Sequence, residues 1–237
     1  MAVLEIGSIV LELNRKAIKN LHISVLPPDG KVRVSAPLGM TETAIRMAVI
    51  SRIPWIKKQQ SDFAKQARQS DREMVSGECH YLWGKRLRLD LVERGGRASV
   101  ELAKSRLRMG LPASASVEER LALLDRFYRR ELKNRIEELL PYWQENIGVI
   151  AVAWGVKKMK TKWGSCNTEA KRIWLNLELA KKPPECLEFV LVHELVHLHE
   201  RHHNERFRAL MDKHLPDWAE RRSLLNSMPL AKGHWLY

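Results

Sequence analysis

The chain has 237 residues, and 41 Lys and Arg against 28 Asp and Glu give it a formal net charge of +13. Hydrophobic residues make up 45% of it, which is enough for the core of one domain or two small ones and excludes wholesale disorder. No apolar run approaches the roughly 18–20 residues of a membrane span, and the first residues lack a signal-peptide pattern. Three widely spaced cysteines exclude a disulfide framework and a four-cysteine zinc ribbon. We therefore expect a cytoplasmic protein.

The positive charge is spread along the chain, with a net charge of +8 in residues 1–149 and +5 in residues 150–237. A dedicated DNA-binding protein more often concentrates its charge on one stripe or tail. This distribution favours a solvated basic surface with a non-specific attraction for nucleic acid and other polyanions.

Alternating apolar residues predict strands in two groups. The first group lies at Ile9–Leu13, Leu21–Val25 and Val32–Val34 and is expected to form a small antiparallel sheet. Between the groups, Thr41 is a predicted helix cap, and Pro54 is expected to kink or restart the helix that follows. The second group comprises 81–82, 87–91, 100–102 and 107–109, with glycines at the turns. No internal repeat is evident from the sequence.

A long helix is predicted from Ser116, because Ser116 and Glu119 form a capping-box pattern and apolar residues follow at helical spacing for about nine turns. Its outer face carries four basic residues, which could contact phosphates, although interspersed acidic residues favour an ordinary solvated face. The four are Arg126, Arg129, Arg130 and Lys133. Strands are expected over 149–159 and 173–177. A domain boundary is expected near 105–116, which separates an N-terminal strand-rich region with one helix (1–110) from a catalytic region (111–237).

Residues 186–200 read as a helix so apolar that it must be buried on several sides. It contains His193-Glu-Leu-Val-His197, an HExxH motif expected by chance in only roughly two chains in a hundred of this composition. Histidines four residues apart on one helix face can both bind one zinc ion, and Glu194 points to the side where a metal-bound water would lie. Buried without partners, these polar groups would each cost several kcal/mol (roughly 2–7). The motif therefore predicts a Zn²⁺ site with Glu194 as the catalytic base.

A catalytic zinc site needs a third protein ligand, and His199, His202 and His203 are the candidates. On a continuous helix they would lie roughly 140°, 160° and 100° from the centre of the His193–His197 pair, so none would face the metal. Asn204 is a typical N-cap, and a helix break before it would leave His203 free to fold back toward the metal. This predicts His203 as the third ligand.

Two segments outside the helix are harder to interpret from physics alone. Gly164 permits a close approach of the backbone, and Ser165 or Cys166 could face a cleft, although a role for Cys166 as a zinc ligand is unnecessary beside three histidines. Asn176 is expected on a strand that lines the cleft, where an extended substrate could add as a further strand. We assign no catalytic role to Asn176.

Four segments together resemble the YgjP-like metallopeptidase family of HExxH zincins, which are relatives of the SprT-like proteins. They are Lys162-Trp-Gly-Ser-Cys166, Ile173-Trp-Leu-Asn-Leu177, His193-Glu-Leu-Val-His-Leu198 and His203-Asn-Glu-Arg-Phe207. The resemblance covers most of the chain, but Lys162 and Arg208 depart from the family pattern. It implies an α+β fold with a zincin-like core, in which a twisted sheet lies on the active-site helix behind the N-terminal strand-rich region. It also implies zinc bound by His193, His197 and His203, with Glu194 as base.

The sequence thus predicts a zinc-dependent metallohydrolase, most simply a peptidase acting on peptide or protein substrates. One alternative is a metal-dependent nucleoside triphosphate hydrolase, which the positive charge and the resemblance both allow, although no GxxxxGK[ST] phosphate-binding loop is present. A second alternative is a DNA-associated SprT-like protease. The lack of a four-cysteine ribbon weakens this second alternative.

Overall fold

The computed structural model describes residues 2–26, 30–65, 73–159 and 162–227. The chain forms two compact units whose boundary falls at residues 69/70. The predicted division at 110/111 lies inside the second unit, between the last two residues of the strand Arg106–Leu111, and it stays a prediction about where the catalytic region begins. None of the described helices has the length and hydropathy that a membrane span requires.

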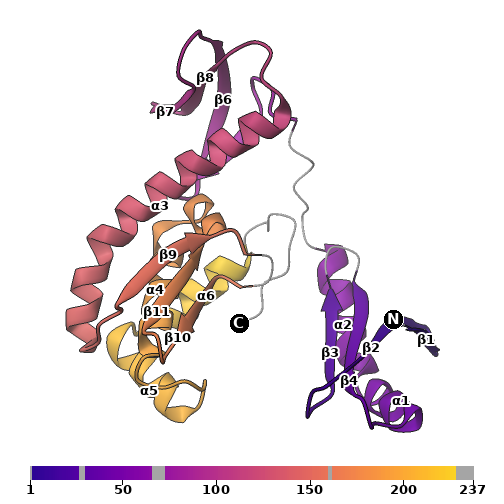
Figure 1. The fold of residues 1–237 in the computed structure, drawn as a ribbon. Coiled ribbons are helices and arrows are strands. Elements are labelled where there is room, and N and C mark those ends of the chain that lie inside the picture. The colour runs from indigo at the N-terminus through magenta and orange to yellow at the C-terminus, as the bar shows by residue number, and fades with distance from the viewer. Residues whose placement is uncertain (1, 27–29, 66–72, 160–161, 228–237) are drawn as a thin grey trace. The chain divides into compact units, whose positions relative to one another are not determined.

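Unit 1 combines one four-stranded sheet, sheet A, with two helices (Figure 1). Its elements are β1 (Ala2–Ile6), β2 (Ile9–Lys16), β3 (His22–Leu26), β4 (Lys31–Pro37), α1 (Glu42–Ile50) and α2 (Ile53–Lys65). The side chain of Thr41 accepts a hydrogen bond from the amide of Ala44, and Pro54 stands near the start of α2, so both helix predictions are confirmed. Apolar residues of both helices and the sheet form one core, which includes Leu11, Val34, Ile45 and Ile56.

Sheet A corrects one prediction, because it is mixed rather than antiparallel. Its strand order is β1-β2-β4-β3, and β2 pairs with β4 in parallel. The alternation of apolar residues identifies strands but says nothing about which strand a given strand will pair with. The first strand, β1, was not predicted.

Unit 2 begins with a second four-stranded sheet, sheet B, and continues into a three-stranded sheet, sheet C, and the remaining helices. Its strands are β5 (Cys79–Leu82), β6 (Lys85–Glu93), β7 (Ser99–Ala103), β8 (Arg106–Leu111), β9 (Ala153–Lys157), β10 (Gly164–Asn167) and β11 (Arg172–Asn176). Its helices are α3 (Val117–Ile147), the short 3₁₀ helix η1 (Leu177–Lys181), α4 (Pro184–Val196), α5 (Glu205–His214) and α6 (Trp218–Ser227). The α+β fold class is confirmed.

Sheet B has the same topology as sheet A. Its order is β5-β6-β8-β7, with an antiparallel pair at each edge and a parallel pair, β6 and β8, at the centre. In each sheet a proline stands four residues before the residue that caps the next helix, Thr41 or Ser116. The structure therefore contains a repeated ββββα arrangement that the sequence did not reveal, because the repeat lies in the strand connections and not in the identity of the residues.

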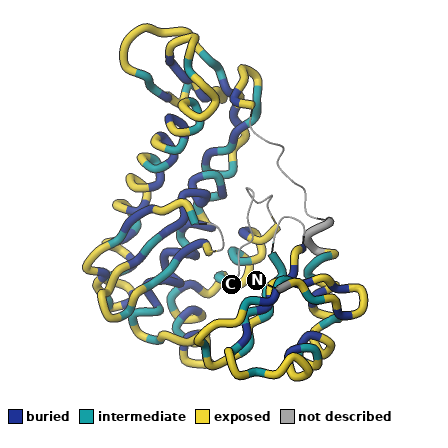
Figure 2. Tube along the Cα trace, turned by 45° about the vertical axis from the view of Figure 1, so that its right-hand side comes forward, coloured by how far each residue is buried: buried dark blue, intermediate teal, exposed yellow. Residues whose placement is uncertain are grey.

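The long helix α3 is confirmed, including its capping box, in which Ser116 and Glu119 exchange hydrogen bonds. Buried residues recur along one side of it, among them Leu124, Leu132 and Ile136, while the opposite side is exposed (Figure 2). Gly148, with φ of 75°, ends the helix in the left-handed conformation that glycine tolerates best. Through this buried side α3 contacts β7, β9, η1 and α4.

Helix α4 lies at the centre of unit 2. It contacts β10 and β11 of sheet C on one side and α3, α5, α6 and η1 elsewhere. Ten of its residues, Cys186, Leu187 and Phe189 to Val196, are buried. The helix ends at Val196, one turn earlier than the predicted end at Glu200, and β10 and α6 were not predicted.

Candidate metal centre

The structure brings His193, His197 and His203 together. One nitrogen from each ring can be chosen so that all three lie within 4.8 Å of one another. The Nε2 atoms of His193 and His203 are 2.9 Å apart, and the centroids of the three rings are separated by 4.7–4.9 Å. Residues 193 and 197 face the same way because they stand four apart on one helical turn.

The turn after α4 places His203 beside His193 and His197. Asn204 caps α5 by accepting a hydrogen bond from the amide of Phe207 at 3.0 Å, as the sequence indicated. Within the turn, the Glu200 carboxylate accepts a hydrogen bond from the amide of His202 at 3.0 Å, and such bonds lower the pKa of Glu200. The break between α4 and α5 thus lets His203 return to His193 and His197.

The neighbouring histidines lie elsewhere. Nε2 of His199 is 2.9 Å from the carbonyl of Ile147, so this ring ties the end of α4 to the end of α3. His202 is exposed and does not belong to the cluster. Of the three candidates for a third ligand, only His203 joins the pair.

The protonation of the cluster follows from its burial. Burial, then the neighbouring rings of His197 and His203 and the charge of Arg222, lower the pKa of His193 to about 2. Burial also lowers the pKa values of His197 and His203. Nδ1 of His197 lies 3.0 Å from the carbonyl oxygen of Glu200. When Nδ1 carries the proton and donates it in a hydrogen bond to this carbonyl, Nε2 of the neutral ring keeps a lone pair. Neutral imidazoles with converging lone pairs are the form that binds a transition metal.

Phe207 forms a wall of the cluster. Its ring centroid lies 4.7–4.9 Å from those of His193, His197 and His203. In the sequence, Phe207 stood out only as the last residue of the segment His203-Asn-Glu-Arg-Phe207, with no role in the site predicted for it. Its position three residues after the capping Asn204 was the local signal that it would lie beside the incoming histidine.

Glu194 is buried next to β10. A Cβ atom at Gly164 would stand 2.5 Å from Oε1 of Glu194 and 2.7 Å from its Cγ, so only glycine leaves room for this side chain. The close approach expected at Gly164 is therefore an approach to Glu194. Ser165 and Cys166 follow on the same strand and are both half-buried.

Cys166 is near the site but lies outside the histidine cluster. Burial, and then the charge of Glu194, raise the pKa of its thiol to about 11. A thiol with this pKa is protonated at neutral pH, whereas a metal ligand must be a thiolate.

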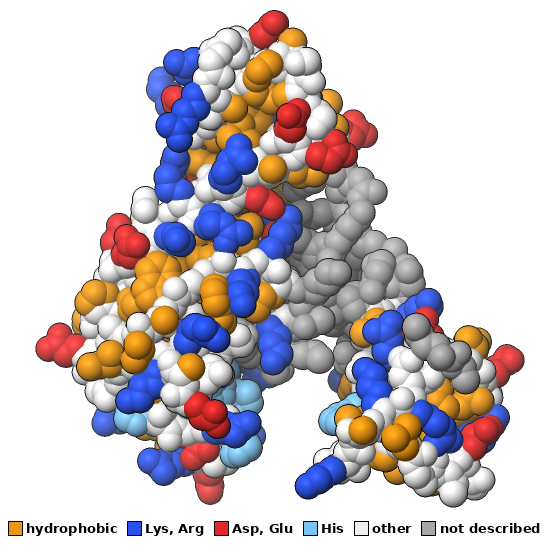
Figure 3. All heavy atoms as spheres, in the orientation of Figure 1, with side chains coloured by type: hydrophobic (Ala, Val, Ile, Leu, Met, Phe, Trp, Pro, Cys, Tyr) orange, Lys and Arg blue, Asp and Glu red, His pale blue; other side chains and the backbone are white. Residues whose placement is uncertain are grey.

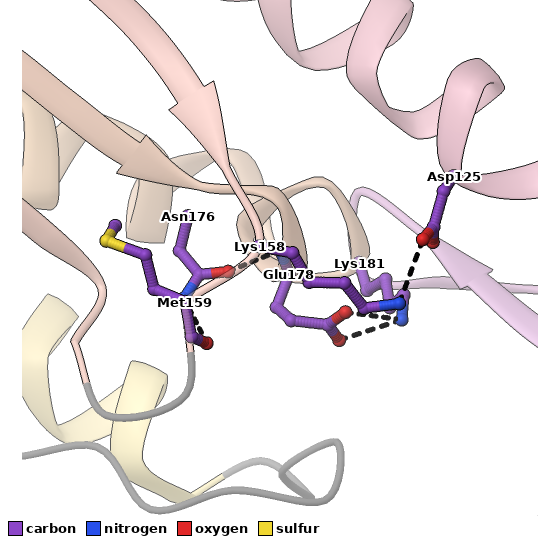
Figure 4. Close-up of polar contacts among 6 residues, drawn as sticks. All are labelled: Asp125, Lys158, Met159, Asn176, Glu178 and Lys181. Carbon is purple, nitrogen blue, oxygen red and sulfur yellow. Dashed lines mark hydrogen bonds and ion pairs between the residues drawn. The ribbon is translucent and has the colours of Figure 1, made fainter. Parts of the chain in front are cut away.

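Asn176 does not line a cleft, and this expectation is corrected. It is buried on β11, the central strand of sheet C. Its amide nitrogen donates to the carbonyl of Met159 (Figure 4) and also to the carbonyl of Lys162. Its amide oxygen accepts from the backbone of Glu178. Asn176 thus bonds to Met159, after β9, and to Lys162, before β10, and Lys158 pairs with Asp125 of α3 at 2.9 Å.

Comparison with known proteins was informative at the family level. A family model described as YgjP-like, metallopeptidase domain, matches residues 19–228. Among solved structures, the crystal structure of the metallopeptidase zymogen of Pyrococcus abyssi abylysin is similar with 19% identity and a TM-score of 0.36, covering 40% of this chain and 98% of that one. No curated protein matches the chain.

The contact between Gly164 and Glu194 generates a prediction about stability. Gly164→Ala should lower the free energy of unfolding by about 1–3 kcal/mol, because the added methyl group overlaps a buried side chain. Urea unfolding followed by tryptophan fluorescence measures the change. Gly95→Ala is the matched control in the same unit, since a Cβ there meets nothing within 4 Å. Equal stability of the two variants would contradict the contact.

A second prediction concerns the thiols. Burial raises the pKa of Cys186 to about 12 and is the main cause of the value of about 11 at Cys166. Relative to the usual value of 9.0, a pKa of 11 reduces the thiolate fraction at pH 8 about a hundredfold. Native protein should therefore react with iodoacetamide at Cys166 at least a hundredfold more slowly than urea-unfolded protein, as peptide mass spectrometry would show. Similar rates would refute the burial argument.

Proposed function

The chain belongs to the YgjP-like metallopeptidase family, and we propose that it is a zinc-dependent peptidase in which Glu194 is the general base. The observation that carries this proposal is the convergence of three neutral imidazoles beside a buried carboxylate. All of these groups come from α4 and the turn that follows it.

His193, His197 and His203 would hold the metal. Two neutral rings with Nε2 atoms 2.9 Å apart need a proton or a cation between their lone pairs. Tetrahedral zinc with Zn–N distances of 2.0–2.1 Å separates its nitrogen ligands by about 3.3 Å, so the donor set fits the ion after a small movement. Three imidazoles without a thiolate are typical of catalytic zinc, which keeps a fourth position open. Bound there, zinc would lower the pKa of a water molecule toward about 7 and polarise the scissile carbonyl.

Glu194 would act as the group that transfers the proton. Its carboxylate would accept a proton from the attacking water and deliver it to the amine that leaves when the peptide bond breaks. The side chain is suited to this role because it follows His193 directly in α4 and is held against Gly164. It is not a member of the histidine cluster, so its role is separable from metal binding.

The substrate would bind along β10. This strand is the edge of sheet C, next to β11, and it carries the glycine that contacts Glu194. An extended peptide that pairs with the free edge of β10 would bring its backbone carbonyls toward the histidine cluster. A free strand edge beside the site favours a peptide over a nucleotide. Hydrolysis of nucleoside triphosphates and action on DNA-bound proteins remain predictions from the charge and the resemblance alone.

Substitution of the base tests its role. Glu194→Gln should retain one equivalent of zinc and the native fold but reduce peptide hydrolysis by at least a hundredfold, because an amide cannot accept the proton. Metal analysis and a fluorogenic peptide assay measure the two properties on the same preparation. Loss of the zinc, or retained hydrolysis, would contradict the assignment.

Substitution of individual histidines tests the ligand set. His203→Ala should weaken zinc affinity by orders of magnitude, whereas His202→Ala should change it little, because His202 lies outside the cluster. His199→Ala should lower stability through loss of the bond to the carbonyl of Ile147 and leave zinc affinity nearly intact. Competition with a chromophoric chelator gives the affinities. Unchanged affinity in His203→Ala would remove this residue from the site.

A further inference from the structure

A groove lies in unit 2 between β7, the β6–β7 connection and the N-terminal half of α3. Its volume is about 590 Å³, and none of its lining residues belongs to the histidine cluster. The apolar side chains of Val100, Leu123 and Phe127 line it and are almost fully buried. Around them stand four arginines: Arg94, Arg97, Arg126 and Arg130. We call this feature the arginine groove.

The residues that the structure describes neutralise the charge of the arginine groove only in part. One acidic residue, Glu101, lines it, and this residue stands opposite Arg108 in the register of β7 and β8. Arg130 pairs with Glu131 at 2.9 Å in an exposed position, where an ion pair is weak. Arg94, Arg97 and Arg126 form no ion pair with any carboxylate in the part of the chain that the structure describes. Figure 3 shows Lys and Arg side chains gathered over β7 and the adjoining face of α3.

Two of these arginines are positioned by local packing. The guanidinium of Arg130 lies 5.2 Å from the centroid of the Phe127 ring, which orients it over the groove floor. The side chain of Arg94 crosses Gly110, where a Cβ would stand 3.4 Å from its Cδ. Held side chains lose less entropy on binding than free ones, and the planar guanidinium can bind a carboxylate through two hydrogen bonds.

One wall of the groove is an open strand edge. β7 is the last strand of sheet B and, among the described strands, pairs with β8 alone, so alternate backbone amides and carbonyls of β7 face away from the sheet. Another extended polypeptide can satisfy both the amide donors and the carbonyl acceptors along this edge of β7. A nucleic acid backbone offers phosphate acceptors only, and the one aromatic ring of the groove, Phe127, is buried and cannot stack on a base.

We propose that the arginine groove binds an acidic, extended segment of a partner or substrate protein, which adds to sheet B as a strand beside β7. Carboxylates on one face of the added strand would pair with Arg94, Arg97, Arg126 and Arg130, and its backbone would bond to β7. The groove and its ligand are independent of the metal chemistry proposed above. In a peptidase, such a groove would bind a substrate protein through an acidic segment that is distant, in the substrate's sequence, from the peptide bond that is cut.

The test measures binding, without turnover, of a fluorescein-labelled ten-residue peptide in which Glu and Val alternate, by fluorescence anisotropy with the full chain. The double variant Arg97→Gln/Arg126→Gln should bind at least tenfold more weakly than the wild type. The matched control Lys133→Gln/Arg135→Gln removes the same charge from exposed positions of α3 outside the groove and should change binding less than twofold. A peptide N-methylated at alternate amides should bind at least tenfold more weakly, because it cannot pair with a strand edge.

Three results would overturn the proposal. Equal losses in the two double variants would indicate diffuse charge attraction in place of a groove. Undiminished binding of the N-methylated peptide would exclude strand addition. Tighter binding of a single-stranded oligonucleotide of matched charge, with the same dependence on Arg97 and Arg126, would assign the groove to nucleic acid. Inactivity toward peptide substrates in the hydrolysis assay would leave this binding result unaffected, so failure of the two proposals is distinguishable.

Discussion

The structure of unit 2 depends on one constraint, which is the burial of an imidazole and a carboxylate, His193 and Glu194, inside the apolar helix α4. His193 and Glu194 are almost fully excluded from solvent, where uncompensated polar groups cost several kcal/mol (roughly 2–7) each. Different neighbouring elements accommodate these buried polar groups. The turn before α5 returns a third imidazole, β10 offers a glycine where a larger residue would collide with the carboxylate, and Phe207 closes the cluster on a further side.

A second set of polar residues holds this arrangement without joining it. Asn176 bonds to the carbonyls of Met159 and Lys162, and His199 links the end of α4 to the end of α3. The hairpin between β5 and β6 reaches the same region, because the amide of Trp83 donates to the carbonyl of Ala180 in η1. Sheet B, α3 and the helix that bears the histidines are therefore connected by directional bonds as well as by apolar packing. These bonds fix the distances on which a metal centre depends.

The features that could be predicted from the sequence are those that depend on residues close to one another in the chain. The spacing of His193 and His197, the cap at Asn204 and the capping box at Ser116 act within a few residues, and the structure has all three in place. Long-range pairing could not be predicted in the same way. Strand β10 has no alternating apolar pattern and exists through its pairing with β11, the parallel pairing of β2 and β4 joins segments about twenty residues apart, and the contact of Gly164 with Glu194 spans thirty.

The shared topology of sheets A and B has a consequence for synthesis on the ribosome. In each sheet the strand made last lies between the second and the third, so β3 has no partner until β4 appears, and β7 none until β8 appears. A nascent chain therefore carries an unpaired strand through each of these intervals, and sheet formation waits for the fourth strand. The helix that contacts each sheet is translated immediately afterwards. Each ββββα segment thus completes its internal strand pairing as soon as its fourth strand is made, and the helix translated next packs against the finished sheet.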